Sequence, residues 1–415
     1  CTTVAVLDTV AEQLADVDLT LPDYCPPKSL SPDNLPFFMF VNKEYMGTKI
    51  LFCDNSLREL LNFRGNVIRY YAEQGFEVVL VAPENCDYDP EFSWIKVVAV
   101  NMSRSGKNPF QDLKYCHTLW TIYKKERPDY IFHYTIKPNI YGTLAAAMCG
   151  MHSSAMIAGL GYVFNKSGIG NRIARCLYRF ALRFSDFVLV LNDYNYRFLQ
   201  EKRIVSSRKL VLLKGGEGVD LSYFHPGGPM PRSGKTSFLM IARLLYDKGY
   251  EEYVNTAEAI RKEYPDCEFQ LLGSVDVAYP NHVAEERVND DHEKGYIRYL
   301  GYQPDVDRYI GRADCIVLPS YHEGLSRVLM EGLAMGKPII TTDIPGCRET
   351  VMDGKNGYLI RPRDTESLIE AVKKFLSLSD TARDAMGKFS HKLAEEIFDI
   401  REVIKVYKKI TGGSI

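Results

Sequence analysis

From residue 49 onward, the chain alternates short apolar segments with longer amphipathic ones. The short segments are rich in Val, Ile, Leu or Phe and predict buried strands, and the apolar spacing between them predicts helices. The first group of strands is expected at residues 50–53, 78–81, 130–133, 154–157, 187–191 and 209–214. The helices among them are expected at residues 67–74, 113–125, 141–149 and 172–184. Such alternation is typical of a parallel sheet with helices on both faces.

The same alternation resumes after residues 224–234, a stretch dense in Gly and Pro that is interpreted as a linker. The second group of strands is expected at residues 238–242, 268–272, 297–300, 315–318, 338–341 and 357–359. The sequence therefore predicts an α/β protein with two similar parallel-sheet domains, residues 46–224 and 225–380. Helical residues 381–415 follow them.

Residues 1–45 differ from the rest, because they hold seven acidic and two basic residues and several prolines. One interpretation is an extension outside the catalytic unit. The other is a small acidic segment that docks onto a partner.

Composition excludes several classes of protein. Hydrophobic residues make up 46% of the chain, which argues against intrinsic disorder, and a net charge of −2 argues against a nucleic-acid-binding protein with a basic surface. The ten cysteines include no Cys-x-x-Cys pair, so zinc sites and a disulfide framework are not expected, and a reducing cytoplasm is favoured. No apolar stretch approaches ~20 residues, so no transmembrane helix is expected.

The most informative stretch is residues 318–338, in which an apolar strand passes through a polar loop into a helix. Its first helical turn is expected at Leu325, Ser326 and Arg327, and its carboxylates are Glu323 and Glu331. A helix start offers unpaired N–H groups to a diphosphate, and nearby carboxylates suit sugar hydroxyls. This combination indicates a nucleotide-sugar site. The plainer alternative is a surface ion pair between Arg327 and Glu331, worth about 0.3–0.5 kcal/mol.

Two cations follow the first predicted strand of the second domain. Arg243 and Lys248 are five residues apart, and at the carboxyl end of a strand they can hold a leaving diphosphate. The alternative is a pair of solvated loop charges.

These motifs together resemble the signature of glycosyltransferase family 4. That signature has two glutamates separated by seven residues, then Ala-x-Gly-x-Pro, which matches Ala334, Gly336 and Pro338. The family pattern Arg-x-x-x-x-Lys-Gly matches residues 243–249, and its Gly-x-Gly-Val-Asp resembles residues 216–220. The resemblance covers about residues 48–412. It implies the GT-B fold, in which two Rossmann-like parallel-sheet domains face a cleft and the last helices pack at the domain junction.

The resemblance also implies roles for residues of the second domain. The catalytic group is expected to be Arg243, Lys248 and Glu323. The donor-binding group is expected to be Gly324, Leu325, Ser326 and Glu331, together with Gly65 of the first domain. No metal and no cofactor are expected, because basic residues and a helix start meet the phosphates. Asp305 and Asp307, which formally match a metal-binding Asp-x-Asp pair, are interpreted as surface residues.

In the first domain, Gly65 is expected in the loop between the first strand and its helix, where it would let a ligand approach the backbone. His133, Lys137 and Asn139 follow a later strand and are expected on the acceptor side, although a lone histidine at a strand end is more often structural. Strings in this domain resemble bacterial transferases that add N-acetylgalactosamine α-1,3 to a polyprenyl-diphosphate-linked sugar. No nucleic-acid partner is expected.

The resemblance implies a retaining transferase that moves a hexose or N-acetylhexosamine from a UDP-sugar to a polyprenyl-diphosphate-linked glycan in surface polysaccharide or glycan biosynthesis. Two alternatives stay open: a UDP-sugar 2-epimerase of the same fold, and a non-catalytic scaffold. A P-loop at residues 228–236 fails on its spacing, and a dinucleotide fingerprint at residues 159–164 lacks its third glycine.

A basic amphipathic helix is expected at residues 171–184. Its four arginines lie on one helical stripe and its apolar residues on an adjacent face: Arg172, Arg175, Arg179 and Arg183, and Ile173, Leu177, Phe180 and Phe184. One interpretation is docking to the anionic inner face of the plasma membrane, which would make the protein cytoplasmic and peripheral. The other is a core-packed helix with a solvated basic side.

Overall fold

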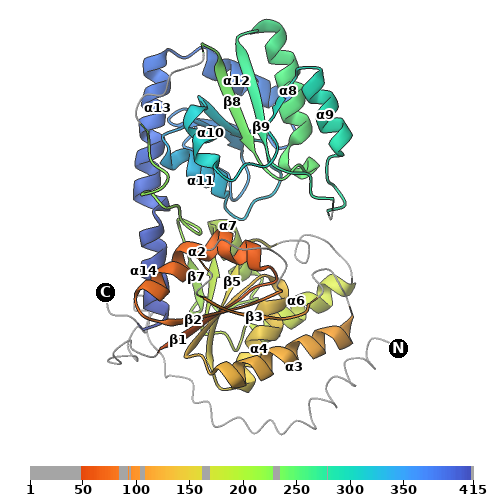
Figure 1. The fold of residues 1–415 in the computed structure, drawn as a ribbon, viewed down its shortest axis with the longest axis vertical. Helices are drawn as coiled ribbons and strands as arrows, with labels where there is room; N and C mark the ends of the chain where they lie inside the picture. Colours follow the sequence, from red (N-terminus) through yellow and green to blue (C-terminus); the bar gives the residue numbers. More distant parts are fainter. Residues whose placement is uncertain are drawn as a thin grey trace.

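The computed structural model describes residues 48–83, 92, 95–102, 108–160, 169–227, 234–277 and 279–412. The N-terminal extension, Gly161 of the fingerprint-like string and most of the Gly- and Pro-rich linker lie outside these residues. Within them, the chain forms two α/β domains, one above the other in Figure 1.

The first domain is built on a seven-stranded parallel sheet with the order β3-β2-β1-β4-β5-β6-β7. Its strands are β1 (Lys49–Cys53), β2 (Glu77–Ala82), β3 (Lys96–Ala99), β4 (Tyr130–Tyr134), β5 (His152–Ile157), β6 (Phe187–Val190) and β7 (Leu210–Leu212). Its helices are α2 (Leu57–Glu73), α3 (Pro109–Glu126), the π-helical turn η2 (Pro138–Gly142), α4 (Thr143–Met148), α6 (Ile169–Ala181) and α7 (Asp193–Glu201).

The second domain is built on a six-stranded parallel sheet with the order β10-β9-β8-β11-β12-β13. Its strands are β8 (Thr236–Ile241), β9 (Cys267–Leu272), β10 (Arg298–Tyr299), β11 (Cys315–Leu318), β12 (Ile339–Thr342) and β13 (Gly357–Ile360). Its helices are the 3-10 turn η3 (Tyr246–Lys248), α8 (Tyr250–Glu263), α9 (Glu285–Glu293), α10 (Val306–Arg312), α11 (Arg327–Ala334), the 3-10 turn η4 (Arg348–Thr350) and α12 (Thr365–Leu376).

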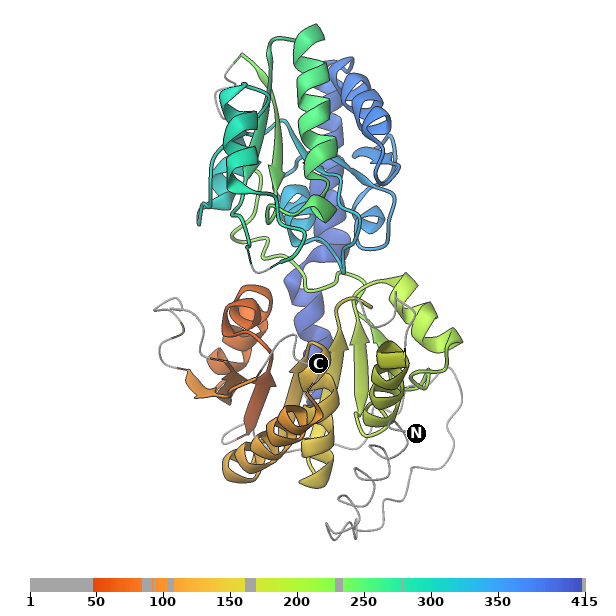
Figure 2. The same cartoon turned by 90° about the vertical axis from the view of Figure 1, so that its right-hand side faces the viewer.

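The last helices join the two domains. Helix α13 (Asp380–Leu393) lies along the second domain, and after a π-helical turn, η5 (Ala394–Phe398), helix α14 (Ile400–Ile410) lies against the first, beside α2 (Figures 1 and 2). Tyr407 of α14 contacts the ring of Phe132 and shares a hydrogen bond of 3.0 Å with the hydroxyl of Tyr134. The C-terminal segment thus completes the core of the first domain.

The chain crosses between the domains twice, and the two crossings are bonded to each other. Val219 donates its N–H to Phe398 O at 2.7 Å and accepts from the Ile400 N–H at 3.0 Å. A Cβ at Gly215 would lie 2.2 Å from the Ile397 oxygen, and one at Gly218 would lie 2.7 Å from Ile400 Cα. These glycines therefore allow the crossings to approach closely.

Two helices have other bounds than predicted, and one strand was not predicted. Helix α6 is shifted by three residues, because it runs from Ile169 to Ala181 and not over residues 172–184. Helix α2 begins at Leu57, not at residue 67, because Ser56 caps it by accepting the Glu59 N–H at 3.3 Å. Strand β3 was missed because it is a four-residue edge strand with no fully buried residue.

Candidate functional site

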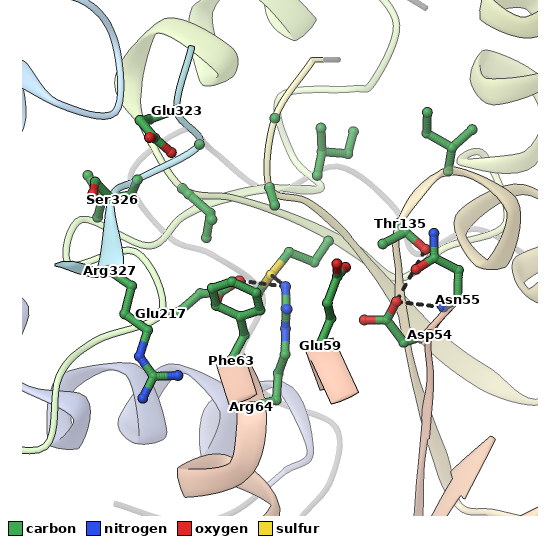
Figure 3. Close-up of a pocket in the computed structure, with 18 of the residues that line it drawn as sticks. Asp54, Asn55, Glu59, Phe63, Arg64, Thr135, Glu217, Glu323, Ser326 and Arg327 are labelled. Atoms are coloured by element: carbon green, nitrogen blue, oxygen red, sulfur yellow. Dashed lines mark hydrogen bonds and ion pairs between the residues drawn. The ribbon is translucent and has the colours of Figure 1, made fainter. Parts of the chain in front are cut away.

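A cavity of about 590 Å³ lies between the two domains and is lined from both (Figure 3). In each sheet it lies at the carboxyl ends of two neighbouring strands, β1 and β4 in the first domain and β8 and β11 in the second. The strand order reverses at these pairs, and ligands of open α/β sheets bind at such switch points. The volume is that of a typical small-molecule site.

The wall from the second domain holds the predicted catalytic residues. Arg243 and Lys248 follow β8, and Glu323 follows β11. Lys248 Nζ lies 2.7 Å from Glu323 Oε1, and both side chains are largely buried. Arg243 is half-exposed, stacks on the Tyr279 ring at 4.3 Å and bonds Asp276 at 3.3 Å. One wall thus presents a cation paired to a carboxylate and a second, more accessible cation.

The start of α11 adds backbone donors to this wall. The helix begins at Arg327, so Leu325 and Ser326 precede it, and the Ser326 side chain makes no capping bond. The Ser326 N–H already bonds Gly346 O at 2.9 Å, whereas the N–H groups of the first turn have no partner within the helix. Leu325 contacts the cores of both domains, and Gly324 O accepts from Asn192 Nδ2 at 2.6 Å. The donor loop therefore also holds the domains together.

Glu331 is more deeply buried than Glu323, the other carboxylate of the motif. It is buried, accepts from Arg327 Nε at 2.8 Å and is not among the residues that line the cavity. Burial raises the pKa of its carboxyl above the ordinary value. The ion pair weighed as the plainer alternative is therefore present, and the expected contact of Glu331 with a ribose stays a prediction.

The wall from the first domain contains a buried charge cluster. Arg64 of α2 pairs with Glu217 at 2.5 Å and packs over the Tyr134 ring at 4.4 Å. Asp54, directly after β1, is fully buried, and burial raises its pKa to about 7. Figure 3 shows Arg64 and Glu59 between Glu217 and Asp54.

Asp54, Arg64 and Glu217 were not expected from the sequence to have a role. Asp54 follows an apolar strand, which is a usable signal, but its importance depends on β4 being the neighbour of β1. That neighbour is set by strand order, which the residues alone do not give. Arg64 and Glu217 are 153 positions apart, and no local pattern links them.

The structure contradicts the expected position of Gly65. This residue is in the interior of α2, where a Cβ would lie 3.1 Å from the Phe92 ring, and it does not line the cavity. Its small size allows α2 to pack against Phe92. The loop expected at Gly65 is part of the helix, because α2 already begins at Leu57.

His133 is also displaced from its expected role. It is fully buried in β4, where its Nε2 lies 3.0 Å from the Tyr123 hydroxyl and its Nδ1 3.4 Å from Thr143. Burial lowers its pKa to about 3, so the ring stays neutral. It does not line the cavity and cannot touch an acceptor there, so the structural alternative holds.

Lys137 and Asn139 do line the cavity. Lys137 is held by Asp112 at 2.6 Å, and Asn139 donates to Met156 O at 2.7 Å and to the Tyr178 hydroxyl at 2.8 Å. The Asn139 Oδ1 atom is buried and has no hydrogen-bond partner among the described residues. Both residues are placed to contact a ligand, and their acceptor role stays a prediction. The described residues contain no group of His, Cys, Asp and Glu that could hold a metal ion.

Two Rossmann-like domains whose switch points face a shared cavity are the arrangement of the GT-B fold. Residues 49–192 match a family described as "Glycosyl transferase 4-like" and residues 235–378 match "Glycosyl transferases group 1". Together the two matches span well over half of the chain, which belongs to the group 1 glycosyltransferases of the family 4 type.

Individual relatives agree with this assignment. The chain is 26% identical over 346 residues to the N,N'-diacetylbacillosaminyl-diphospho-undecaprenol alpha-1,3-N-acetylgalactosaminyltransferase of Campylobacter jejuni, covering 79% of this chain and 89% of the relative. It is 24% identical over 274 residues to an Escherichia coli UDP-Gal:alpha-D-GlcNAc-diphosphoundecaprenol alpha-1,3-galactosyltransferase, covering 63% and 70%.

Solved structures show the same fold. A glycosyltransferase of Rickettsia africae superposes with a TM-score of 0.73 at 21% identity, covering 89% of this chain and all of that one. An Anabaena protein, Alr3699/HepE, in complex with UDP and glucose superposes with a TM-score of 0.72 at 17% identity, covering 87% and 98%.

Proposed function

We propose that the protein transfers a hexose or N-acetylhexosamine from a UDP-sugar to a polyprenyl-diphosphate-linked glycan, with retention of configuration. The observation that carries this proposal is the assembly of Arg243, Lys248, Glu323 and the start of α11 around one cavity. The two relatives named above, whose names specify lipid-diphosphate-linked acceptors, support this choice of acceptor.

The geometry suggests how the residues would divide the work. Arg243 and Lys248 would stabilise the charge that develops on the leaving diphosphate, which is usually the largest single contribution to catalysis. Glu323, held in place by Lys248, would accept hydrogen bonds from donor-sugar hydroxyls. The N–H groups at the start of α11 would meet the phosphates.

Retention without an enzymic nucleophile requires attack on the face from which the diphosphate departs. The acceptor hydroxyl oxygen forms a bond to the anomeric carbon as the bond from that carbon to the phosphate oxygen breaks. The bonding pair stays on the phosphate oxygen, which takes the acceptor proton. The products are UDP and the extended glycan, and no metal or cofactor takes part in this scheme.

We also propose that α6 and the turn after it dock on an anionic membrane, at its cytoplasmic face. The face of this segment that packs inward is Tyr178, Ala181 and Leu182, whereas Phe180 and Phe184 are 48% and 39% exposed and contact each other. Three of its arginines are exposed, and none of the four forms an ion pair with another described residue. None of the helices in the described ranges is long and apolar enough to cross a bilayer.

Incubation with a panel of radiolabelled UDP-sugars and polyprenyl-diphosphate-linked acceptors tests the enzymatic proposal. Label should enter the lipid fraction for at least one donor, with an α linkage. Conversion of the nucleotide sugar without acceptor would instead establish the epimerase. Binding of UDP without turnover on any acceptor would establish the non-catalytic scaffold.

A further inference from the structure

Asp54 is placed at the point of the first domain that faces the second. It follows β1 directly, and β1 pairs with β4 at the switch point of the sheet. Its side chain is fully buried from water, yet it lines the cavity. A carboxyl group in such a place has to find its partners within the protein or in a ligand.

Only one of its two oxygens finds a partner in the described part of the chain. Oδ1 accepts the Asn55 N–H at 2.5 Å and lies 3.4 Å from the Thr135 hydroxyl. Oδ2 has no hydrogen-bond partner among the described residues, and in Figure 3 it points away from Asn55, toward the side of Glu59. A buried carboxylate oxygen without a partner destabilises a fold, so its persistence points to a ligand that completes it.

Backbone strain adjoins the same spot. Thr135, which follows β4 and lines the cavity, has a φ of +66°. A β-branched residue is a clear outlier in this region, and such strain concentrates at ligand sites. Its backbone conformation places the Thr135 hydroxyl beside Asp54.

The surrounding charge selects the kind of ligand group. Glu59 and Glu217 lie on the same wall as Asp54. Arg64 is the strongest charge acting on Asp54, but it also pairs with Glu217, so the three carboxylates outnumber the one cation. A phosphate would be repelled there, whereas a hydroxyl could donate a hydrogen bond to Oδ2. Burial also raises the pKa of this carboxyl to about 7, and a hydroxyl can bond either of its protonation states.

We propose that Asp54 binds a hydroxyl group of the acceptor sugar through its free oxygen and thereby positions the acceptor against the donor bound on the opposite wall. This inference rests on the proposed transferase function. It assigns a sugar-hydroxyl subsite to the switch point of the first domain.

Asp54→Asn tests the inference, because the amide keeps an oxygen for the Asn55 N–H but replaces the free acceptor with a donor. With saturating UDP-sugar, the variant should raise the KM for the lipid-linked acceptor at least tenfold and leave the Kd for UDP within twofold of wild type. Asp129→Asn is the matched control. Asp129 directly precedes β4, at the amino ends of the strands and therefore away from the cavity, and it accepts from Lys49 N at 2.8 Å. It should behave as wild type.

A second measurement keeps the inference separate from the transfer assay. Saturation-transfer NMR with UDP and phenyl N-acetylhexosaminides reports glycoside binding directly. Binding by wild type and Asp129→Asn but not by Asp54→Asn supports the subsite even if no transfer is found. An Asp54→Asn protein with wild-type acceptor KM, kcat and glycoside binding overturns it. A wild-type protein that neither transfers nor binds any glycoside overturns the proposed function and the subsite together.

Discussion

Lys248 and Glu323 illustrate how single residues at this site depend on each other. Their ion pair fixes the carboxylate that would meet the sugar and the cation that would meet the phosphate within 2.7 Å. Arg243 is more accessible, and its neighbours Asp276 and Tyr279 orient it without burying it. A departing diphosphate would therefore meet Arg243 as a pre-positioned cation.

Replacement of Arg243 by alanine should lower kcat on the order of a hundredfold or more, as the loss of one electrostatic donor does elsewhere. Initial rates with radiolabelled UDP-sugar measure the effect. Arg298→Ala is the control, because Arg298 of strand β10 pairs with Glu268 of β9 and neither residue lines the cavity. Equal turnover in Arg243→Ala and wild type would remove Arg243 from the mechanism.

Asp54→Asn should make the protein more stable, in a way that depends on pH. The Asp54 pKa rises from 3.8 to about 7 on folding, because burial penalises the charged form. The negative charges of Glu59 and Glu217 add to the rise, and the positive charge of Arg64 opposes it. Below pH 3.8 the carboxyl is protonated in both states and adds no penalty. Between pH 3.8 and 7 only the unfolded chain ionises, so the native state loses stability, and above pH 7 the penalty is constant.

Urea unfolding at two pH values measures this effect. The variant should exceed wild type by about 2–4 kcal/mol at pH 8 and by less than half of that at pH 5. A gain that is the same at both pH values would show that Asp54 is not the titrating group. A variant that is more stable but binds acceptor more weakly would match the usual trade between function and stability.

Part of this site could be predicted from residues alone. Arg243, Lys248, Glu323 and Ser326 belong to local motifs, and each follows a recognisable strand or starts a helix. Asp54, Arg64 and Glu217 gain their meaning from burial and from pairing across the chain, which the order of residues does not state. His133 was expected on the acceptor side, although a lone histidine at a strand end is more often structural. Its burial and its contacts with Tyr123 and Thr143 support the structural role.

At the scale of elements, the strong strands were predicted well and the boundaries less so. Strands β4 and β11 are buried along their whole length, and all of their residues except His133 are aliphatic, aromatic or cysteine, so both strands are visible in the sequence. Helix α2 was shortened in the prediction because its first turns mix charged and apolar residues, although Ser56 and Glu59 form a capping pattern. Edge strand β3 has no strong pattern of apolar residues, because a strand that is only partly buried does not require one.

Segment α6 should bind anionic vesicles through its exposed aromatic and basic residues. The double variant Phe180→Ser, Phe184→Ser should at least halve the bound fraction on vesicles containing phosphatidylglycerol, because it removes apolar area at the membrane boundary. Flotation measures the bound fraction. Phe110→Ser is the control, since Phe110 is 79% exposed on α3. Equal flotation of the double variant and wild type would exclude this face.

At the scale of the whole molecule, the first domain depends on the last helix of the chain. Tyr407→Ala removes a fully buried ring that contacts Phe132 and bonds Tyr134. The substitution should destabilise the first domain by about 3–5 kcal/mol, as large aromatic deletions do. Chemical unfolding followed by tryptophan fluorescence measures it, since Trp120 of α3 lies in that domain. Tyr302→Ala, at a 72% exposed position, should have no such effect.

The paired crossings at Val219 and Phe398–Ile400 constrain how the two halves can move. The two bonded segments can act as a hinge, because rotation of one domain about their common line leaves both hydrogen bonds intact. Rotation about any other axis would break them. Opening of the molecule is then reduced to one angle. Gly324 and Leu325 of the donor loop contact the first domain. A sugar nucleotide bound at this loop would therefore also set the angle between the domains. We accordingly predict that the sugar nucleotide binds before the acceptor.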